Sequence, residues 1–116
     1  MRVLIVLALL LTGCTEQARL EGDIAQVMKD PGSVKFGELR TIRGVTCGEM
    51  NAKNGFGAYT GMTPFMVKDG GLYVASNAAQ RMDVCCPMHQ LTEVRDSLRQ
   101  TFEQCQATLP EPIPLG

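Results

Sequence analysis

The chain has 116 residues and a nearly balanced charge, with 11 Lys and Arg against 12 Asp and Glu. This length is enough for one domain and too short for two, and a domain of this size buries only a modest core. Basic residues are spread along the chain without a block or stripe, so the composition excludes the usual footprint of a nucleic-acid-binding protein.

The first residues have the order of a secretory signal. Arg2 precedes an unbroken apolar run at residues 3–11, which is typical of a signal peptide and falls short of the roughly 20 residues that a transmembrane helix needs. The sequence Leu-Thr-Gly-Cys at residues 11–14 then resembles the lipobox of bacterial lipoproteins, in which a lipid transferase alkylates the cysteine thiol before the signal is cut. We therefore expect residues 1–13 to be removed and Cys14 to carry lipid.

Such an anchor would be durable. Each buried methylene group contributes about 0.8 kcal/mol, and a processed lipoprotein carries two or three acyl chains. Thr15 occupies the position where Gram-negative lipoproteins of the inner membrane commonly have aspartate. By this resemblance we expect a lipid-anchored protein of the outer membrane that faces the periplasm. Residues 14–19 would form a polar tether between the lipid and the domain.

The other four cysteines are Cys47, Cys85, Cys86 and Cys105. An even number of cysteines in an oxidising compartment predicts two disulfides. A bridge between adjacent cysteines would strain the peptide between them, so we expect Cys47 to pair with one member of the adjacent pair and Cys105 with the other. Each bridge typically adds about 2–4 kcal/mol, which is comparable with the whole stability of a small domain.

The adjacent cysteines also make a metal site an alternative. They lie close to the chain's only histidine, and methionine and imidazole are ligands that suit copper. Structural zinc sites, however, usually space their thiols by two to four residues, whereas adjacent cysteines point apart. We therefore expect no metal or other cofactor, and a metal-handling lipoprotein remains the alternative. Its ligands would be Met82, Cys85, Cys86, Met88 and His89.

Hydrophobic periodicity predicts a helix near each end of the mature chain. The first has one apolar face made by Leu20, Ile24, Val27 and Met28. Asp-Pro-Gly at residues 30–32 would end it. The second has its apolar face at Leu91, Val94, Leu98, Phe102 and Cys105. A disulfide from Cys105 to the adjacent pair would then pin this helix to the sheet.

Between these helices, short β-forming runs punctuated by glycine predict an antiparallel sheet. The expected strands are 34–43, 45–51, 59–67 and 72–75. Gly37 is expected to mark a bulge, and Lys-Asp-Gly-Gly at residues 68–71 predicts a tight hairpin, because glycine tolerates positive φ.

The rest of the domain gives weaker patterns. Residues 76–87 are expected to form a loop with a short strand at 81–84. The proline-rich tail at 109–116 is expected to form an extended, loose end. The predicted fold is α+β, a small antiparallel sheet flanked by an N-terminal and a C-terminal helix, in one disulfide-stabilised domain at residues 20–108.

The most distinctive stretch of the mature chain starts at Cys47. Its sequence Cys-Gly-Glu-Met-Asn-Ala-Lys-Asn leads into a segment of glycine and aromatic residues that ends at Phe65. Together with Lys-Asp-Pro at residues 29–31 and the run at 33–36, it resembles a group of small lipoproteins of Gram-negative bacteria and prophages. The resemblance covers about residues 29–67, implies a lipoprotein domain of that group and carries no established activity.

Polar side chains of this stretch are a candidate patch for binding a glycan or an envelope protein. They are Glu49, Asn51, Lys53, Asn54 and Tyr59. Turn chemistry is the competing explanation, because asparagine also bonds its own backbone in turns. The sequence lacks the spacing of a catalytic triad, a redox Cys-x-x-Cys pair or a phosphate-binding loop, so we expect no enzyme. We expect a binding or structural lipoprotein, and the alternatives include an inhibitor or prophage exclusion factor that acts on an envelope protein.

Overall fold

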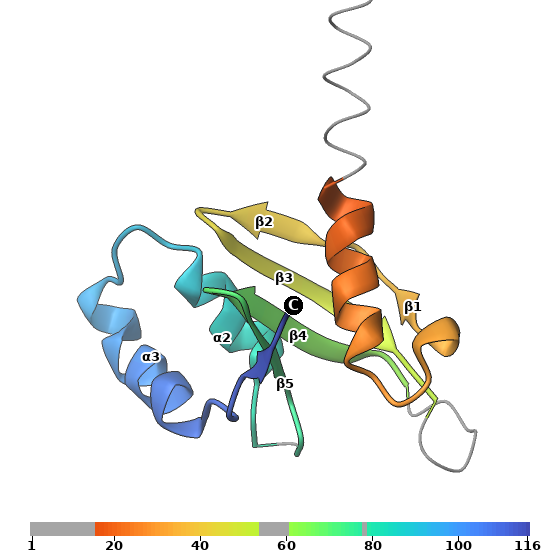
Figure 1. The fold of residues 1–116 in the computed structure, drawn as a ribbon. Coiled ribbons are helices and arrows are strands. Elements are labelled where there is room, and N and C mark those ends of the chain that lie inside the picture. Colours follow the sequence, from red (N-terminus) through yellow and green to blue (C-terminus); the bar gives the residue numbers. More distant parts are fainter. Residues whose placement is uncertain (1–15, 54–60, 78) are drawn as a thin grey trace, which may run out of the picture.

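The computed structural model describes residues 16–53, 61–77 and 79–116. Its centre is an antiparallel sheet with the strand order β1-β3-β4-β5-β6, in which β2 also pairs with β3. The strands are β1 (Lys35–Phe36), β2 (Arg40–Ile42), β3 (Val45–Asn51), β4 (Thr63–Lys68), β5 (Gly71–Val74) and β6 (Ile113–Pro114). The helical parts are residues 16–26, a 3-10 turn at Pro31–Ser33, α2 (Met82–His89) and α3 (Asp96–Thr108). The predicted α+β class is confirmed (Figure 1).

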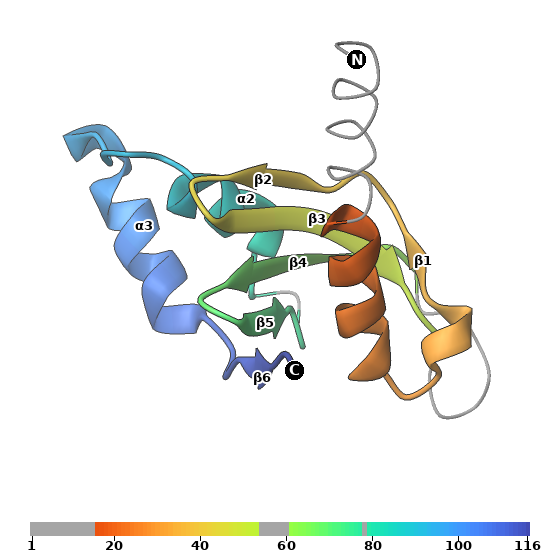
Figure 2. The same ribbon diagram turned by 45° about the horizontal axis from the view of Figure 1, so that its top comes forward.

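Helices cover opposite faces of the sheet. Phe65 and Met66 are neighbours on β4, so their side chains point to opposite faces, and each belongs to a different buried cluster. The N-terminal helix packs on one face, in a buried cluster of Ile24, Met50, Phe65, Val67 and Leu72. α2 packs on the other face, in a cluster of Val45, Met66, Met82 and Cys86. α3 contacts α2, and their shared cluster holds Cys85, Met88, Phe102 and Cys105. The sheet is thus covered by the N-terminal helix on one face and by α2 on the other, and α3 lies to the side of the sheet (Figure 2).

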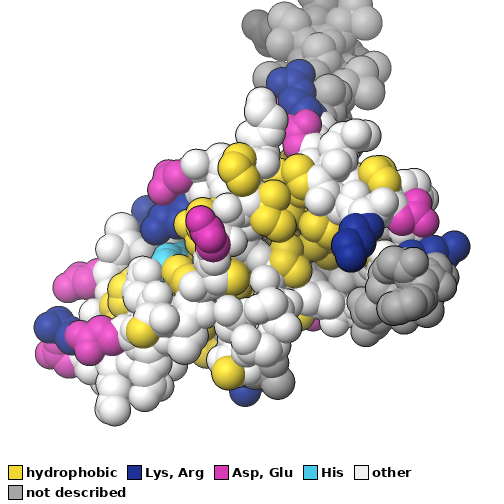
Figure 3. Space-filling view, turned by 60° about the horizontal axis from the view of Figure 1, so that its bottom comes forward, with side chains coloured by type: hydrophobic (Ala, Val, Ile, Leu, Met, Phe, Trp, Pro, Cys, Tyr) yellow, Lys and Arg dark blue, Asp and Glu magenta, His cyan; other side chains and the backbone are white. Residues whose placement is uncertain are grey.

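The N-terminal helix leaves some apolar side chains at the surface. Figure 3 shows hydrophobic side chains gathered beside this helix, with charges of both signs scattered around them. The hydrophobic residues that are partly buried around the first cluster are Leu20, Val27, Met28, Val34, Phe36, Leu39, Val74 and Leu115. Ile24 belongs to the first cluster, and Leu20, Val27 and Met28 pack against it. The predicted apolar face of the first helix is therefore confirmed as the face that covers the sheet.

Two tight hairpins set the register of the sheet. Asp69 and Gly70 join β4 to β5 with φ angles of 51° and 74°, and Arg43 and Gly44 join β2 to β3 with φ angles of 54° and 77°. Positive φ at both central residues gives a turn whose twist matches that of the flanking strands. The hairpin predicted at residues 68–71 is confirmed, and the turn at Arg43 is a second one of the same kind.

Both disulfides meet on α2. Cys47 of β3 bonds Cys86, with 5.8 Å between their Cα atoms, and Cys85 bonds Cys105 of α3, with 5.5 Å. Successive residues of a helix point about 100° apart, so one cysteine of the adjacent pair faces the sheet and the other faces α3. The prediction of two disulfides that each use one of the adjacent cysteines is confirmed. The bridge from Cys105 fixes α3 to α2, and only through α2 to the sheet.

The strand predicted at residues 81–84 is wrong, because this segment begins α2. Met82 and Cys86 are buried against the sheet and lie four residues apart, which is the spacing of one helical face, and Cys85 is buried towards α3. Pro87 lies inside the helix and hides this pattern in the sequence, since proline removes a backbone donor and disfavours a helix interior. The helix continues only to His89.

The ends of the other helical segments also differ from expectation. Residues 16–19 are the first described turn of the N-terminal helix rather than a free tether. The C-terminal helix starts at Asp96, so Leu91 lies before it and is 48% exposed. The proline-rich tail is extended as expected but not loose. Ile113 pairs with Leu72 of β5, and the Leu115 N–H donates to the Gly70 carbonyl at 2.9 Å.

Two glycine substitutions test the packing with opposite expected signs. A Cβ at Gly48 would lie 2.9 Å from the Phe65 ring, whereas one at Gly22 would meet no atom within 4 Å. We expect Gly48→Ala to lower the free energy of unfolding by about 1–3 kcal/mol. Gly22→Ala should raise it by about 0.5–1 kcal/mol, because alanine favours a helix. Urea unfolding followed by circular dichroism measures both, and a stabilising Gly48→Ala would contradict the packing.

A cysteine variant tests the disulfide pairing. Peptide mapping alone cannot separate Cys85 from Cys86 because they are adjacent. In a Cys85→Ala chain we expect Cys47 and Cys86 to stay bonded and Cys105 to be alkylated as a free thiol, as read by non-reducing mass spectrometry. Alkylation of Cys47, together with a bridge between Cys86 and Cys105, would show that the pairing is the other one.

Candidate functional site

A pocket of about 480 Å³ opens where α2 lies against β3 and β4. We call it the α2 groove. Its lining residues are Glu38, Arg40, Cys47, Gly48, Glu49, Pro64, Phe65, Met82, Asp83, Cys86 and Pro87. Its size is within the range of pockets that bind small molecules or a few residues of a peptide.

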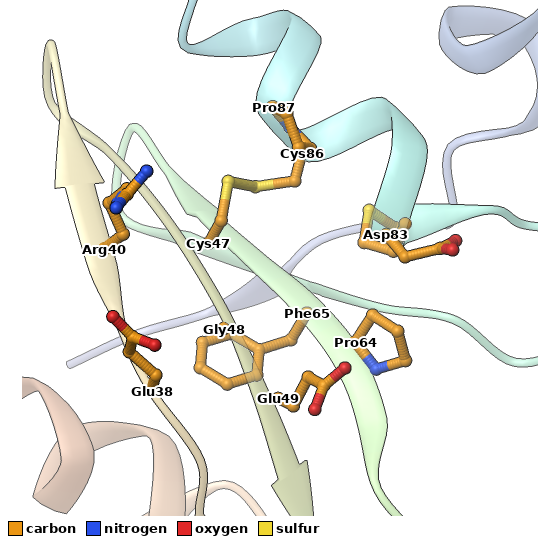
Figure 4. A pocket seen from close by; sticks show the side chains of 11 residues that line it. Glu38, Arg40, Cys47, Gly48, Glu49, Pro64, Phe65, Asp83, Cys86 and Pro87 are labelled. Atoms are coloured by element: carbon orange, nitrogen blue, oxygen red, sulfur yellow. A yellow bond between two sulfur atoms is a disulfide. The ribbon is translucent and has the colours of Figure 1, made fainter.

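The covalent geometry of the domain shapes the groove. The Cys47–Cys86 disulfide bridges its two sides, from the sheet to α2, and Pro87 extends the side made by α2 (Figure 4). Backbone at Gly48 forms part of the floor, because a side chain at this position would point to the opposite face of the sheet, where the Phe65 ring lies. The groove therefore has a rigid wall on the disulfide side and a floor that is partly backbone.

Charged side chains of both signs surround this floor. Arg40 and Glu38 lie on the edge-strand side, and Glu49 rises from β3 near Pro64 (Figure 4). All three charged residues are exposed. Among the described residues, none of them belongs to an ion pair. Their charges are consequently available to a ligand.

Asp83 is the exception among the charged lining residues. Its carboxylate accepts two hydrogen bonds from Arg81, both at 3.1 Å. The hydrogen bond from this guanidinium lowers the pKa of Asp83 below its usual value. Both side chains are largely in solvent, where an ion pair contributes little to stability. Asp83 thus meets the groove as a carboxylate whose charge is already balanced.

Gln90 fixes the position of the groove's edge. Its Nε2 donates to the Arg40 carbonyl at 2.9 Å and to the Val45 carbonyl at 3.0 Å. The side chain is buried, so both bonds are protected from water. The end of α2 is therefore tied to the β2–β3 hairpin. No sequence pattern pointed to this residue.

The structure divides the predicted polar patch. Glu49 lines the α2 groove. Asn51 lies further along β3, where its Oδ1 accepts the Gly61 N–H at 3.1 Å, a bond between residues ten positions apart rather than within one turn. The backbone N–H of Lys53 donates to the Ser33 hydroxyl at 3.2 Å. Asn54 and Tyr59 are outside the described residues. The groove residues that the sequence did not single out come from several elements: Glu38 and Arg40 from the edge-strand side, Gly48 from β3, Pro64 and Phe65 from β4, and Asp83 and Pro87 from α2.

The disulfides argue against the metal site that the sequence offers as an alternative. Cys85 and Cys86, the two thiols that it needs, are both in disulfides, and an oxidised cysteine offers no thiolate to zinc. Met82 and Met88 are buried in different clusters. Within the described ranges, no group of three or more His, Cys, Asp or Glu side chains is placed to hold a metal ion.

His89 lies away from the α2 groove. Its Nδ1 is 3.5 Å from Nζ of Lys68, and its ring packs against Phe102 with 5.2 Å between the ring centroids. Nε2 is buried without a hydrogen-bond partner in the part of the chain that the structure describes. Burial and the nearby Lys68 charge both lower the pKa of His89 below 6.5. The imidazole is therefore neutral in the folded domain near neutral pH.

This pKa shift predicts a loss of stability in mild acid. The unfolded chain takes up a proton near pH 6.5 and the folded chain only at lower pH, so the contribution of His89 is complete above pH 6.5 and is lost as pH falls through the folded-state pKa. Urea unfolding at about pH 7.5 and about pH 5 should show a smaller drop for His89→Leu than for the native chain. Equal drops in the two chains would mean that His89 does not titrate in this way.

The predicted N-terminal signal and Cys14 lie outside the described residues. Among the described residues, none of the helices has the length and apolar character needed to cross a membrane. Comparisons of this chain with protein-family models, with curated proteins and with solved structures find no match.

Proposed function

We propose that this chain is a lipid-anchored outer-membrane protein that faces the periplasm and binds a partner protein in the α2 groove without catalysing a reaction. The observation that carries the proposal is the use of the cysteines. Four of the five are bonded in two disulfides, and the fifth is the cysteine of the lipobox-like sequence at residues 11–14.

The disulfides and the signal support each other. Disulfides persist in oxidising compartments such as the periplasm and are rare in the cytosol, so a domain held by two of them fits an exported protein. The charged start, the short apolar run and the small residues before Cys14 have the order of an export signal. Because the other four cysteines pair with one another, neither disulfide of the domain uses Cys14.

The groove favours a peptide segment over a glycan. Arg40 and Glu49 offer opposite charges on either side of a backbone floor, an arrangement that suits a chain with side chains of both signs. Sugars are commonly bound on exposed aromatic faces, but Phe65, the aromatic residue that lines the groove, is 0% exposed. We therefore assign the groove to a segment of an envelope protein.

Binding without a reaction fits the placement of the acidic groups. Enzymes make a general acid by burying a carboxyl in apolar surroundings, whereas Glu38 and Glu49 are exposed. The only histidine lies between Lys68 and Phe102 rather than in the groove. An inhibitor of an envelope protein would be a special case of this proposal, distinguished by the activity of the captured partner.

The anchor is tested by Cys14→Ser. The proposal predicts that the native chain carries acyl groups on Cys14 by mass spectrometry and fractionates with outer membranes, because two or three acyl chains hold essentially permanently. The variant should lack the acyl groups and leave the membrane fraction. Membrane attachment that is unchanged in Cys14→Ser would contradict the anchor.

The groove is tested by charge reversal. The acylated chain should crosslink to an envelope protein in intact envelopes, and Glu49→Lys should weaken its binding to the purified partner about tenfold, equivalent to about 1.4 kcal/mol. Glu103→Lys on α3 is a matched control, since Glu103 is also exposed and lies outside the groove. An equal effect of the two substitutions, or none from Glu49→Lys, would exclude the groove as the binding site.

A further inference from the structure

The N-terminal helix starts beside the β2 edge of the sheet. Glu16 and Gln17, from its first described turn, share a pocket with Leu39 and Thr41 at β2. From there the helix crosses the sheet towards Ile24, which packs on Phe65 of β4 and Leu72 of β5. Figures 1 and 2 both show the start of this helix level with β2 and far from β6.

This placement limits the distance between the domain and an acylated Cys14. Only Thr15 lies between Cys14 and Glu16, and the two residue-to-residue steps span at most about 7 Å even when the chain is fully extended. The helical state of residues 16–19 leaves no longer spacer. The lipid headgroups therefore lie close to the β2 edge whenever the acyl chains are inserted.

The side chains at this edge suit a phospholipid surface. Ile42, at the tip of the β2–β3 hairpin, is 39% exposed, and Leu91, next to the Gln90 that bonds this hairpin, is 48% exposed. Arg40 and Arg43 flank Ile42 and have no ion pair among the described residues. Exposed apolar side chains beside arginine are the combination that inserts into a headgroup layer and attracts anionic lipid. Glu38 is the acidic residue nearest in sequence.

We propose that Arg40, Ile42, Arg43 and Leu91 form a membrane-contact surface that seats the domain on anionic phospholipid in one orientation. This inference rests on the proposed lipid anchor. β6 is the opposite edge of the sheet, about 19 Å away across four strand spacings, and it faces the periplasm. The α2 groove, which shares Arg40 with this surface, opens beside the headgroups, where it meets segments of membrane-bound partners.

A pair of tryptophan reporters tests the orientation. The chain contains no tryptophan. Ile42→Trp places one at the contact surface, and Ile113→Trp places a matched control on β6, where the native isoleucine is 36% exposed. The acylated full-length variants are inserted into vesicles of phosphatidylethanolamine and phosphatidylglycerol that contain brominated acyl chains. We expect blue-shifted and quenched emission from the Ile42→Trp reporter and neither effect from the Ile113→Trp reporter. Replacing phosphatidylglycerol with phosphatidylcholine should reduce the quenching.

The possible outcomes distinguish a failure of the membrane-contact surface from a failure of the lipid anchor on which it rests. Absence of acyl groups on Cys14 would overturn both. An acylated chain whose two reporters are quenched equally, or not at all, would overturn the contact surface and leave the anchor intact. Shielding of the Ile42→Trp reporter in native envelopes but not in protein-free vesicles would assign the β2 edge to a protein partner and would also overturn it.

Discussion

Two disulfides on adjacent residues of one short helix are the constraint on which this domain depends. α2 has eight residues, contains Pro87 and begins without a hydrogen bond from the side chain of its N-cap residue to the helix backbone, and helices this short are not stable alone in water. Cys86 fastens its inner side to β3, and Cys85 fastens its outer side to α3. Because a helix turns about 100° per residue, adjacency in sequence lets one helix join two different layers. The other face of the sheet is closed by apolar packing of the N-terminal helix around Ile24.

The same constraint creates the site. With α2 held to Cys47, the groove between helix and sheet has a covalent wall, and the backbone at Gly48 forms part of its floor. Gln90 extends this rigidity from the end of α2 to the β2–β3 hairpin. Groove, hairpin and the start of the N-terminal helix therefore form one connected edge of the molecule. An anchor at Cys14 would place this edge, rather than β6, at the membrane.

The sequence predicted the features that depend on local chemistry. The hairpin at Asp69 and Gly70 follows from the φ angles that glycine allows, and the first helix follows from the spacing of its apolar residues. Non-local causes explain the errors. α2 was missed because Pro87 opposes helix formation locally, whereas the helix depends on disulfides to residues far away in sequence. The tail was expected to be loose because proline disfavours central strands, but an edge strand tolerates it. Of the groove, the sequence singles out Glu49 as a binding residue, Cys47 and Cys86 as disulfide partners and Met82 as a possible metal ligand, since the other residues meet only through the fold.

The central claim is that the disulfides, and not local helix stability, hold α2 and α3 on the sheet. Hydrogen exchange of the full-length chain before and after reduction and alkylation of the cysteines tests it most directly. The account predicts that backbone amides of Met82–His89 and Asp96–Thr108 lose protection on reduction while those of β3, β4 and β5 retain most of theirs. Unchanged protection in both helices, or an equal loss throughout the sheet, would contradict it.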